Sequence, residues 1–297
     1  MSSGDLGMSA LKIAAAEGPI GAEITGIDVS RPLDDETFQA VDGAIHRYAV
    51  VVIRDQTLTA PALAEFSRRF GRPQVNVRSG ANNEGTPEVG WISNVTKDGK
   101  PVGSHDAGRY WHSDLCYLEK PSKLTILNAL EVPTKDGVTY GATQFAGTVA
   151  AYDALSEAVK QRLDGLRGAN SYRNMWNRKA KEFGARALLS EAELRKYPPD
   201  AIHPVVRTHP KTGQKCLFVC DGYTNAILGL PRQESDELLG FLFDHINRSE
   251  FKYEHQWRVG DVLMWDNCAV QHKAGFDYAP PLRRLMQRCT IEGDVPF

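Results

Sequence analysis

Two segments that are remote in the sequence most constrain how this chain can fold. The first is His112-Ser113-Asp114, and the second is residues 265–272, Trp-Asp-Asn-Cys-Ala-Val-Gln-His, which ends in His272. In an extended strand, residues i and i+2 project to the same side, so His112 and Asp114 are predicted to point together while Ser113 points away. Adding His272 to this pair requires distant strands to fold alongside one another, as they do in a barrel.

These residue types suit one kind of metal centre. Two imidazoles and one carboxylate can occupy one face of an octahedral ferrous ion and leave three positions open, which is the ligand set of non-haem iron oxygenases. A His-x-Asp triplet alone also fits a strand-end histidine followed by a surface aspartate, because coincidences of three common residues are frequent. The surrounding sequence must decide between the two interpretations.

The segment after His272 adds two arginines. Residues 277–290 form a turn-rich loop that leads into a predicted strand with Arg284 and Arg288 on one face. An arginine that faces a pocket usually binds a carboxylate, because its planar guanidinium makes two parallel charge-assisted hydrogen bonds. The pair would also fit a solvated exterior strand, but beside three candidate metal ligands it favours an anion site.

With these residues in place, the chain resembles the taurine dioxygenase and dichlorophenoxyacetate dioxygenase family of iron(II)- and 2-oxoglutarate-dependent enzymes. The resemblance runs from about Leu11 to Phe297. It is carried by Trp-His-Ser-Asp at 111–114, Gly-Val-Thr at 137–139, the segment 265–272 and Arg-Arg-x-Met-x-Arg at 283–288. Further matches occur in the same order at 21–26, 70–71, 150–155 and 203–210.

The resemblance implies a role for each matching residue. The two histidines and the aspartate named above would ligate iron. Thr139 and Arg284 would hold the distal carboxylate of 2-oxoglutarate, and Arg288 would lie between this cosubstrate and the substrate. The implied reaction consumes O2 and 2-oxoglutarate, gives succinate and CO2, and hydroxylates a small organic acid such as a sulfonate or an aryloxyalkanoate. Hydroxylation at a carbon that bears sulfur or oxygen would lead to C–S or C–O cleavage.

The resemblance also bears on the type of reaction. Related halogenating enzymes lack the carboxylate ligand, whereas this chain has Asp114 at that position, so hydroxylation is expected.

The substrate-binding positions match less well. Asn76 stands where taurine dioxygenase has a histidine, and Gly108 where it has an asparagine, which argues against taurine. Tyr110, in a polar loop before the metal motif, and Tyr223, which matches a family aromatic, are candidates for contacting the substrate together with Asn76 and Arg288. Each tyrosine also fits an ordinary structural role.

Residues 171–179 are aromatic and basic and lie where the family has a mobile lid, in a predicted insert at about 167–200. Basic and aromatic segments also occur in nucleic-acid-binding proteins. However, 35 Lys and Arg against 37 Asp and Glu give a net charge of -2, so no basic excess is available to neutralise phosphates. We therefore expect a lid over an anion and no nucleic-acid partner.

The composition sets the remaining expectations. A chain of 297 residues with 42% hydrophobic content can form a single domain over 1–297. It has no apolar run long enough to span a membrane and no apparent secretion signal. Its five cysteines form no Cys-x-x-Cys pair, which indicates reduced thiols. We expect a cytoplasmic enzyme that forms a homo-oligomer and does not bind membranes.

Strand patterns alternate with a few helices along the chain. Asp34 or Asp35 is predicted to start a helix through Tyr48, followed by a buried strand at 49–53, and Thr59 to start another helix. A strand at 124–130, a hairpin of 204–208 with 215–219 and a helix at 232–247 follow. These elements predict a mainly β fold with flanking helices, a double-stranded β-helix or jelly roll.

Two other functions use a similar fold. A cupin-type metal-dependent isomerase or hydrolase could use the same ligands with another metal, but it would not need a pocket for a dicarboxylate. A non-catalytic binding protein would be expected to have lost a metal ligand, and none is missing here. The sequence therefore favours a dioxygenase.

Overall fold

The computed structural model describes residues 11–75, 82–83, 85–184, 187–195 and 197–297. Two helices near the start have clear sequence causes. Helix α1 (Asp35–Tyr48) begins where the side chain of Asp34 accepts a hydrogen bond from the backbone N–H of Thr37, and α2 (Ala60–Arg68) begins at Thr59 in the same way. Both predicted helix starts are confirmed.

Eight strands form the main sheet. In spatial order they are β1 (Lys12–Ala15), β2 (Ala22–Thr25), β3 (Val50–Ile53), β18 (Val262–Asp266), β8 (Ser122–Glu131), β20 (Leu285–Glu292), β5 (Thr86–Ser93) and β4 (Asn82–Asn83). Among the described strands of this sheet, β2 and β3 pair in parallel and the other neighbours pair antiparallel. Because β18 and β20 both flank β8, the carboxyl end of the chain supplies strands to the middle of the sheet.

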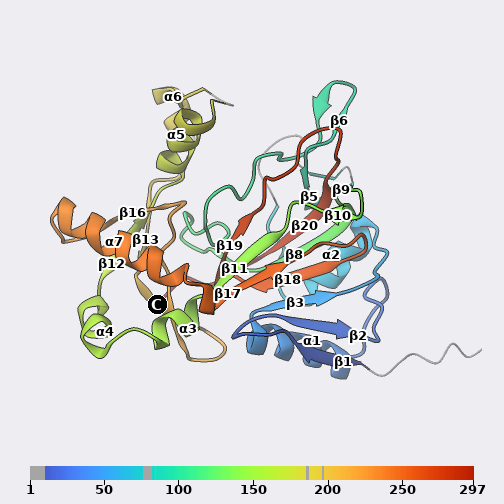
Figure 1. The fold of residues 1–297 in the computed structure, drawn as a ribbon, viewed down its shortest axis with the longest axis horizontal. Coiled ribbons are helices and arrows are strands. Elements are labelled where there is room, and N and C mark those ends of the chain that lie inside the picture. The colour runs from blue at the N-terminus through green and yellow to red at the C-terminus, as the bar shows by residue number, and fades with distance from the viewer. Residues whose placement is uncertain (1–10, 76–81, 84, 185–186, 196) are drawn as a thin grey trace, which may run out of the picture.

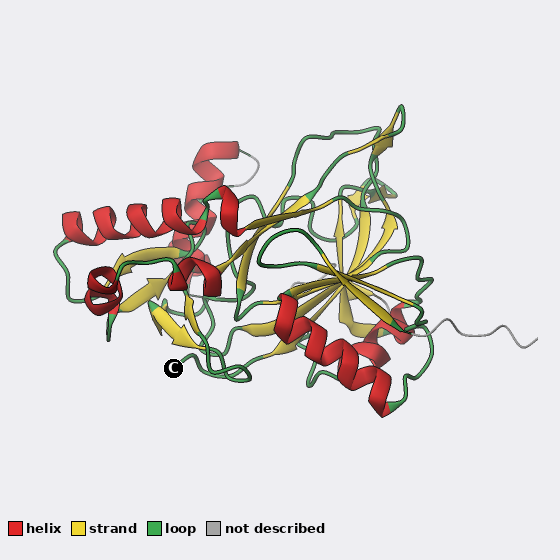
Figure 2. Cartoon of the chain, turned by 60° about the horizontal axis from the view of Figure 1, so that its bottom comes forward, coloured by secondary structure: helices red, strands yellow, loops and turns green. Residues whose placement is uncertain are grey.

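A smaller antiparallel sheet lies against the main one. It consists of β17 (Lys252–His255), β11 (Thr143–Gly147) and β19 (Val270–Ala274). An isolated bridge between His112 and His272 extends it by the segment that carries the candidate metal motif. The strands of the two sheets are seen nearly edge-on in Figure 2.

Strand β3 shows why the main sheet is apolar on both faces. Val51 and Ile53 pack in a core with α1 and α2, whereas Val50 and Val52 pack in a second core with Phe145 of β11. A strand that is covered on both sides is expected to be continuously hydrophobic, which explains the Val-Val-Val-Ile run. The second core therefore lies between the two sheets, and the predicted mainly β fold with outer helices is confirmed.

A third core lies beside the two sheets, at the left of Figure 1. Its residues come from the helices α3 (Thr148–Asp153), α4 (Glu157–Leu163) and α7 (Arg232–Ile246), from the 3-10 turn η1 (Ser249–Phe251) and from the strands β14 (Val206–Thr208), β15 (Lys215–Leu217) and β16 (Thr224–Ile227). The strands β12 (Arg167–Asn170) and β13 (Ala201–Pro204) form one sheet with β16. The hairpin of β14 and β15 and the long helix α7 confirm two further predictions.

The predicted lid region contains two helices, α5 (Tyr172–Phe183) and α6 (Glu191–Leu194), that stand away from the sheets in Figure 1. It also contains β12, which is paired on both sides with β13 and β16. Two short hairpins complete the fold, β6 (Thr96–Lys97) with β7 (Lys100–Pro101) and β9 (Thr134–Lys135) with β10 (Val138–Thr139). Among the described residues, none of the helices combines the length and the hydropathy needed to cross a lipid bilayer.

Candidate metal centre

The structure brings the three predicted metal ligands together. His112 and His272 exchange backbone hydrogen bonds of 3.0 and 2.8 Å, which places their side chains next to each other. Asp114 lies 3.6 Å from Nε2 of His112 and 3.9 Å from Nε2 of His272, measured to its two carboxylate oxygens. All three residues are buried, and one ligand atom from each lies within 4.8 Å of the others.

The local backbone differs from the prediction of a strand through the His-x-Asp motif. Only His112 has a strand-like pairing, and the chain turns from Asp114 onward, with Leu115 in a left-handed conformation at a φ of 56°. The predicted side-chain directions nevertheless hold, because the hydroxyl of Ser113 donates to the carbonyl of Asn267 on the opposite side. The predicted strand was wrong, because this segment forms a single β-bridge at His112 before the chain turns.

The histidine rings are oriented for a metal at Nε2. Nδ1 of His112 lies 2.9 Å from the carbonyl of Tyr110 and 3.0 Å from that of His272, so Nδ1 carries a proton and donates it. Nε2 of His112 therefore faces Asp114. Burial alone would lower the pKa of His112, but the hydrogen bond and the charge of Asp114 raise it above its ordinary value. Burial, reinforced by repulsion from His112, lowers the pKa of His272 to about 3. Neutral imidazole is the form that binds a metal.

Two polar side chains fix Asp114 from behind. The hydroxyl of Thr125 donates a hydrogen bond of 2.6 Å to Oδ2 of Asp114. The side-chain oxygen of Asn267 accepts the backbone N–H of Asp114 at 3.1 Å, and its amide nitrogen donates to the Thr125 oxygen at 2.9 Å. Such outer contacts orient a ligand and are a common part of metal sites. Oδ1 of Asp114 is thereby directed toward His112.

The charge of the site suits a divalent cation. Burial alone would raise the pKa of Asp114, but His272, His112 and Arg288 together hold it well below its usual range. The carboxylate is therefore ionised, and a ferrous ion could bind between it and the Nε2 atoms of the two histidines, which both face it. These donors fit the facial ligand set of non-haem iron.

Of the two predicted arginines, Arg288 lies beside this site. Nη1 of Arg288 is 3.9 Å from Oδ1 of Asp114. Arg284 is 5% exposed, its Nη1 donates to the carbonyl of Gly141, and its Nε has no hydrogen-bond partner among the described residues. A buried guanidinium nitrogen without a partner is costly, so this position suits an anionic ligand.

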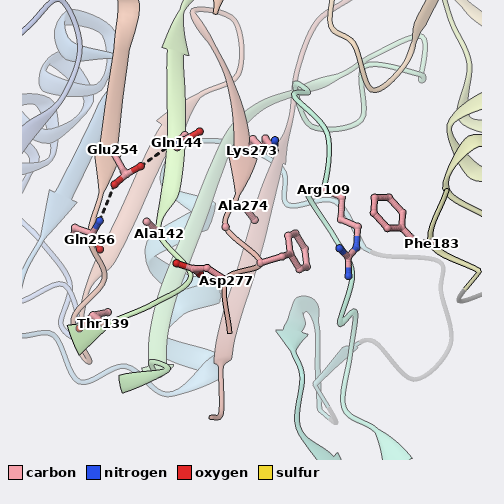
Figure 3. Close-up of a pocket in the computed structure, with 12 residues that line it drawn as sticks. Arg109, Thr139, Ala142, Gln144, Phe183, Glu254, Gln256, Lys273, Ala274 and Asp277 are labelled. Atoms are coloured by element: carbon pink, nitrogen blue, oxygen red, sulfur yellow. Dashed lines mark hydrogen bonds between the residues drawn. The ribbon is translucent and has the colours of Figure 1, made fainter. Parts of the chain in front are cut away.

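Thr139 lies in different surroundings from Arg284. It is in the short hairpin of β9 and β10 and lines a cleft of about 540 Å³ together with Gln144 and Lys273 (Figure 3). Gln144 and Lys273 alternate along their strands with Phe145 and His272, which face the metal centre, so this cleft lies on the opposite face of the small sheet.

Thr143 is the threonine that shares a buried layer with Arg284. Its hydroxyl accepts a hydrogen bond of 3.0 Å from the indole N–H of Trp257, and the guanidinium carbon of Arg284 lies 5.6 Å from the Trp257 ring centre. The sequence carried a signal for this residue, because Thr143 and Phe145 are two positions apart and therefore share one face of a strand. The Gly-Val-Thr segment led to the prediction of Thr139 in its place.

The proposed substrate-contacting residues are placed differently. The ring of Tyr223 lies 6.1 Å from that of His112 and stacks on Tyr117 at 5.2 Å. Tyr110 instead donates a hydrogen bond of 2.6 Å to Glu182, so it contacts α5. Asn76 lies outside the described residues.

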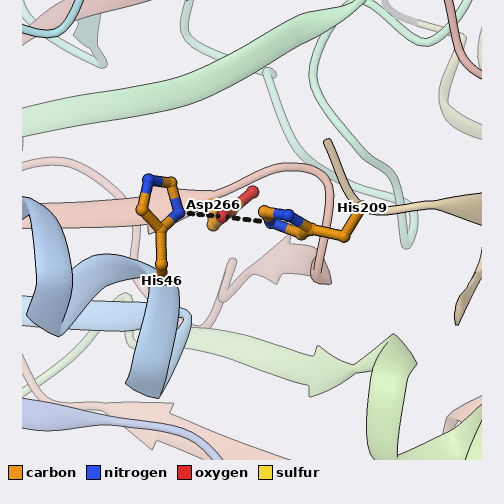
Figure 4. A group of neighbouring side chains, drawn as sticks. All are labelled: His46, His209 and Asp266. Carbon is orange, nitrogen blue, oxygen red and sulfur yellow. Dashed lines mark hydrogen bonds and ion pairs between the residues drawn. The ribbon is translucent and has the colours of Figure 1, made fainter. Parts of the chain in front are cut away.

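A second cluster of possible ligands consists of His46, His209 and Asp266 (Figure 4). Oδ2 of Asp266 lies 2.8 Å from Nε2 of His209 and 3.2 Å from Nδ1 of His46. Nδ1 of His209 accepts backbone N–H groups from Lys211 and Thr212, so its proton is on Nε2 and points at Asp266. These atoms already satisfy one another, which favours a charged bridge between elements over a second metal site.

Comparison with known proteins decides the family. Residues 12–290 match the family described as Taurine catabolism dioxygenase TauD, TfdA family. The chain belongs to this family. Similar TauD/TfdA relatives include pentalenolactone F synthase of Streptomyces arenae, 31% identical over 94% of each chain. Another is the alpha-ketoglutarate-dependent 2,4-dichlorophenoxyacetate dioxygenase of Cupriavidus pinatubonensis, 32% identical over 92% of this chain and 95% of the relative.

Solved structures agree with the TauD/TfdA assignment. A taurine dioxygenase from Burkholderia xenovorans matches with a TM-score of 0.78 at 30% identity. The match covers 97% of this chain and 91% of the dioxygenase chain. AAD-2 in complex with Mn(II) and N-oxalylglycine has a TM-score of 0.81 at 28% identity, over 97% and 98% of the two chains. The resemblance expected from the sequence is confirmed: the chain is a 2-oxoglutarate-dependent dioxygenase that uses Fe(II) and O2. The alternative of an isomerase or hydrolase is not supported.

Proposed function

We propose that this dioxygenase hydroxylates a small organic acid at a ferrous ion held by His112, Asp114 and His272. The observation that supports this proposal best is the convergence of these three buried side chains with their metal-binding atoms turned toward one another. When bound, iron would supply the redox chemistry that couples decarboxylation of 2-oxoglutarate to substrate oxidation.

In this proposal Arg284 binds the distal carboxylate of 2-oxoglutarate. Its unpartnered Nε and its burial support this role, because a carboxylate would provide the missing acceptor. We propose Thr143 as the accompanying hydroxyl, since it lies in the same buried layer, and we keep Thr139 as the alternative inferred from sequence. Both threonines can be tested against each other.

Arg288 would orient the substrate. It lies beside Asp114 and is partly exposed, at 23% of its side chain, so it can meet an anion that enters from solvent. Relatives are named for dichlorophenoxyacetate, sulfonates and sulfate esters, which are all organic anions. We therefore propose a sulfonate, an aryloxyalkanoate or a similar acid, with Tyr223 as part of the wall and with C–S or C–O cleavage where the hydroxylated carbon bears sulfur or oxygen.

The test of this proposal is succinate release. Purified protein with ferrous iron, ascorbate and 2-oxoglutarate should form succinate slowly without substrate, and His112→Ala or Asp114→Ala should abolish this activity while the circular dichroism spectrum is unchanged. Asp244→Ala, on the exposed face of α7, serves as the control and should keep full activity. Wild-type succinate release in both ligand variants would refute the assignment.

The substrate can be identified by its ability to stimulate succinate release. A panel of sulfonates, aryloxyalkanoates and sulfate esters is compared by the increase in succinate release, with mass spectrometry to separate hydroxylated from cleaved products. A neutral substrate that stimulates more than every acid would contradict the role of Arg288.

We also propose that the protein is a cytoplasmic homo-oligomer. The cysteine usage described above supports a reducing compartment. Size-exclusion chromatography with light scattering tests the oligomer, and a monomer at all concentrations would refute it.

A further inference from the structure

Two buried thiols touch beside the metal centre. The sulfurs of Cys116 and Cys220 are 3.8 Å apart, and the two residues are 2% and 3% exposed. The thiol of Cys216, by comparison, donates to the carbonyl of Gln214. Sulfur–sulfur contact between residues so far apart in sequence means that the fold has already brought the two side chains together.

Each cysteine belongs to a segment that shapes the site. Cys116 is in the turn that follows Asp114. Cys220 begins the turn that leads to Tyr223, whose ring faces His112. Between them the backbone N–H of Gly222 donates to the carbonyl of Trp111 at 2.9 Å, so the two segments lie in direct contact. A change in the sulfur distance would therefore act on the metal-bearing turn.

A small internal cavity reaches both sulfurs. It is lined by Cys116, Cys220, Ser113, Asn267 and Cys268 among others, and has a volume of about 10 Å³. A space of this size is close to that of one water molecule. Hydrogen peroxide, which has two oxygen atoms, therefore reaches the sulfurs only when the lining side chains move, and a bulky disulfide such as oxidised glutathione is excluded.

We propose that Cys116 and Cys220 are an oxidation site that forms an intramolecular disulfide on exposure to hydrogen peroxide. The thiolate of one cysteine attacks a peroxide oxygen, which breaks the O–O bond and gives a sulfenic acid and one water. The second thiol displaces the hydroxyl of this sulfenic acid as a second water, and the S–S bond forms. Two thiols lose two electrons and two protons, and peroxide is reduced to two waters.

The bond would change the metal site. A disulfide requires the sulfurs to approach to about 2.0 Å, so the two turns must move toward each other. One turn carries Asp114 and the other carries Tyr223. We expect the crosslinked protein to lose succinate release in proportion to the crosslinked fraction, and dithiothreitol to restore it.

The test uses the full-length protein at stoichiometric hydrogen peroxide. Peptide mapping with and without reduction should identify a Cys116–Cys220 crosslink, both in metal-free protein and in protein loaded with ferrous iron. Because the crosslink is read by mass, its formation is measured independently of the dioxygenase activity. A crosslink without any activity change would refute the effect on the site, and failure of the activity itself would concern the proposed function alone.

Variants separate this pair from the other thiols. Cys116→Ser and Cys220→Ser should each prevent the crosslink and the reversible loss, relative to the activity of the same variant when reduced. Cys216→Ser and Cys289→Ser, which replace buried cysteines outside the pair, should crosslink and lose activity as the wild type does. A crosslink to Cys268, irreversible oxidation of single cysteines, or no modification under conditions that oxidise free thiols would overturn the proposal.

Discussion

At the scale of single residues, the carboxylate of the proposed metal ligand Asp114 is held by neutral partners. Thr125 and Asn267 come from β8 and from the turn after β18, and together they contact both the side chain and the backbone of Asp114. Both side chains are uncharged, so they act by orienting the carboxylate through hydrogen bonds. The quality of this site therefore depends on residues that do not touch the metal.

Replacing Thr125 tests this dependence. Thr125→Val keeps the shape of the side chain but removes the hydroxyl, so Asp114 should rotate more freely and bind metal less well. We expect the dissociation constant for Mn(II), measured anaerobically by calorimetry, to rise by about 10- to 100-fold. Thr125→Ser keeps the hydrogen bond and should stay near the wild type. Equal affinities in Val and Ser variants would contradict the positioning role.

Arg284 should determine the affinity for 2-oxoglutarate. If Arg284 binds the cosubstrate as proposed, Arg284→Ala removes one partner of a buried ion pair, which costs about 2 to 5 kcal/mol. The Michaelis constant for 2-oxoglutarate should rise sharply in steady-state assays. Arg283→Ala, which removes an exposed arginine paired with Glu131, is the matched control and should change little. An unchanged constant in Arg284→Ala would exclude this role.

At the scale of elements, helix α5 is fastened to the segment that precedes the metal motif. The ammonium group of Lys179 lies 3.0 Å from a carboxylate oxygen of Asp106, and both side chains are almost completely buried. Arg178 pairs with Asp221, and its guanidinium carbon lies 4.2 Å from the ring centre of Tyr110. The predicted lid is thus connected by charge to loops on both sides of the site.

Removing the buried lysine should loosen this helix. Lys179→Met leaves Asp106 as a buried carboxylate with one charge partner fewer, a change that costs about 3 to 5 kcal/mol in buried pairs. Hydrogen exchange across α5 should become faster, and the Michaelis constant for the substrate should rise. Arg232→Met breaks the exposed pair with Asp236 on α7 and should leave the exchange of α5 as it is. Unchanged hydrogen exchange of α5 in Lys179→Met would show that the Lys179–Asp106 pair does not hold this helix in place.

At the scale of the whole molecule, one charged bridge connects the outer helices with the sheets. His46 comes from α1, Asp266 from the end of β18 and His209 from the turn after β14. Hydrogen bonds to Asp266 and then to Asp42 raise the pKa of His46 from 6.5 to about 9. His46 is therefore protonated at neutral pH, and the bridge carries a positive charge between two carboxylates.

This pKa shift predicts a pH dependence of stability. The folded-state pKa of His46 is raised, so its contribution is fully present below pH 6.5 and is lost as pH rises through about 9. Between these values the free energy of unfolding should fall by about 1 to 3 kcal/mol more in the wild type than in His46→Gln, as measured by urea denaturation. Parallel pH profiles of the two proteins would contradict the bridge.

The sequence by itself determined the local features of this protein. Side-chain caps at Asp34 and Thr59 set the helix starts, the apolar run at β3 set a doubly covered strand, and the ligand types of His112, Asp114 and His272 set the chemistry. These features depend on neighbours within a few residues or on the residue type itself, so they can be predicted without knowing the fold.

Only the tertiary structure decided which distant groups meet. It ended the strand at His112, directed Tyr110 to α5 and placed Thr143 in the layer of Arg284, while Thr139 faces a cleft on the other side of the small sheet. It also brought Cys116 against Cys220. The physical reason is that alternation along a strand gives the face of each residue, but the register between strands, which the whole sheet determines, gives its partner.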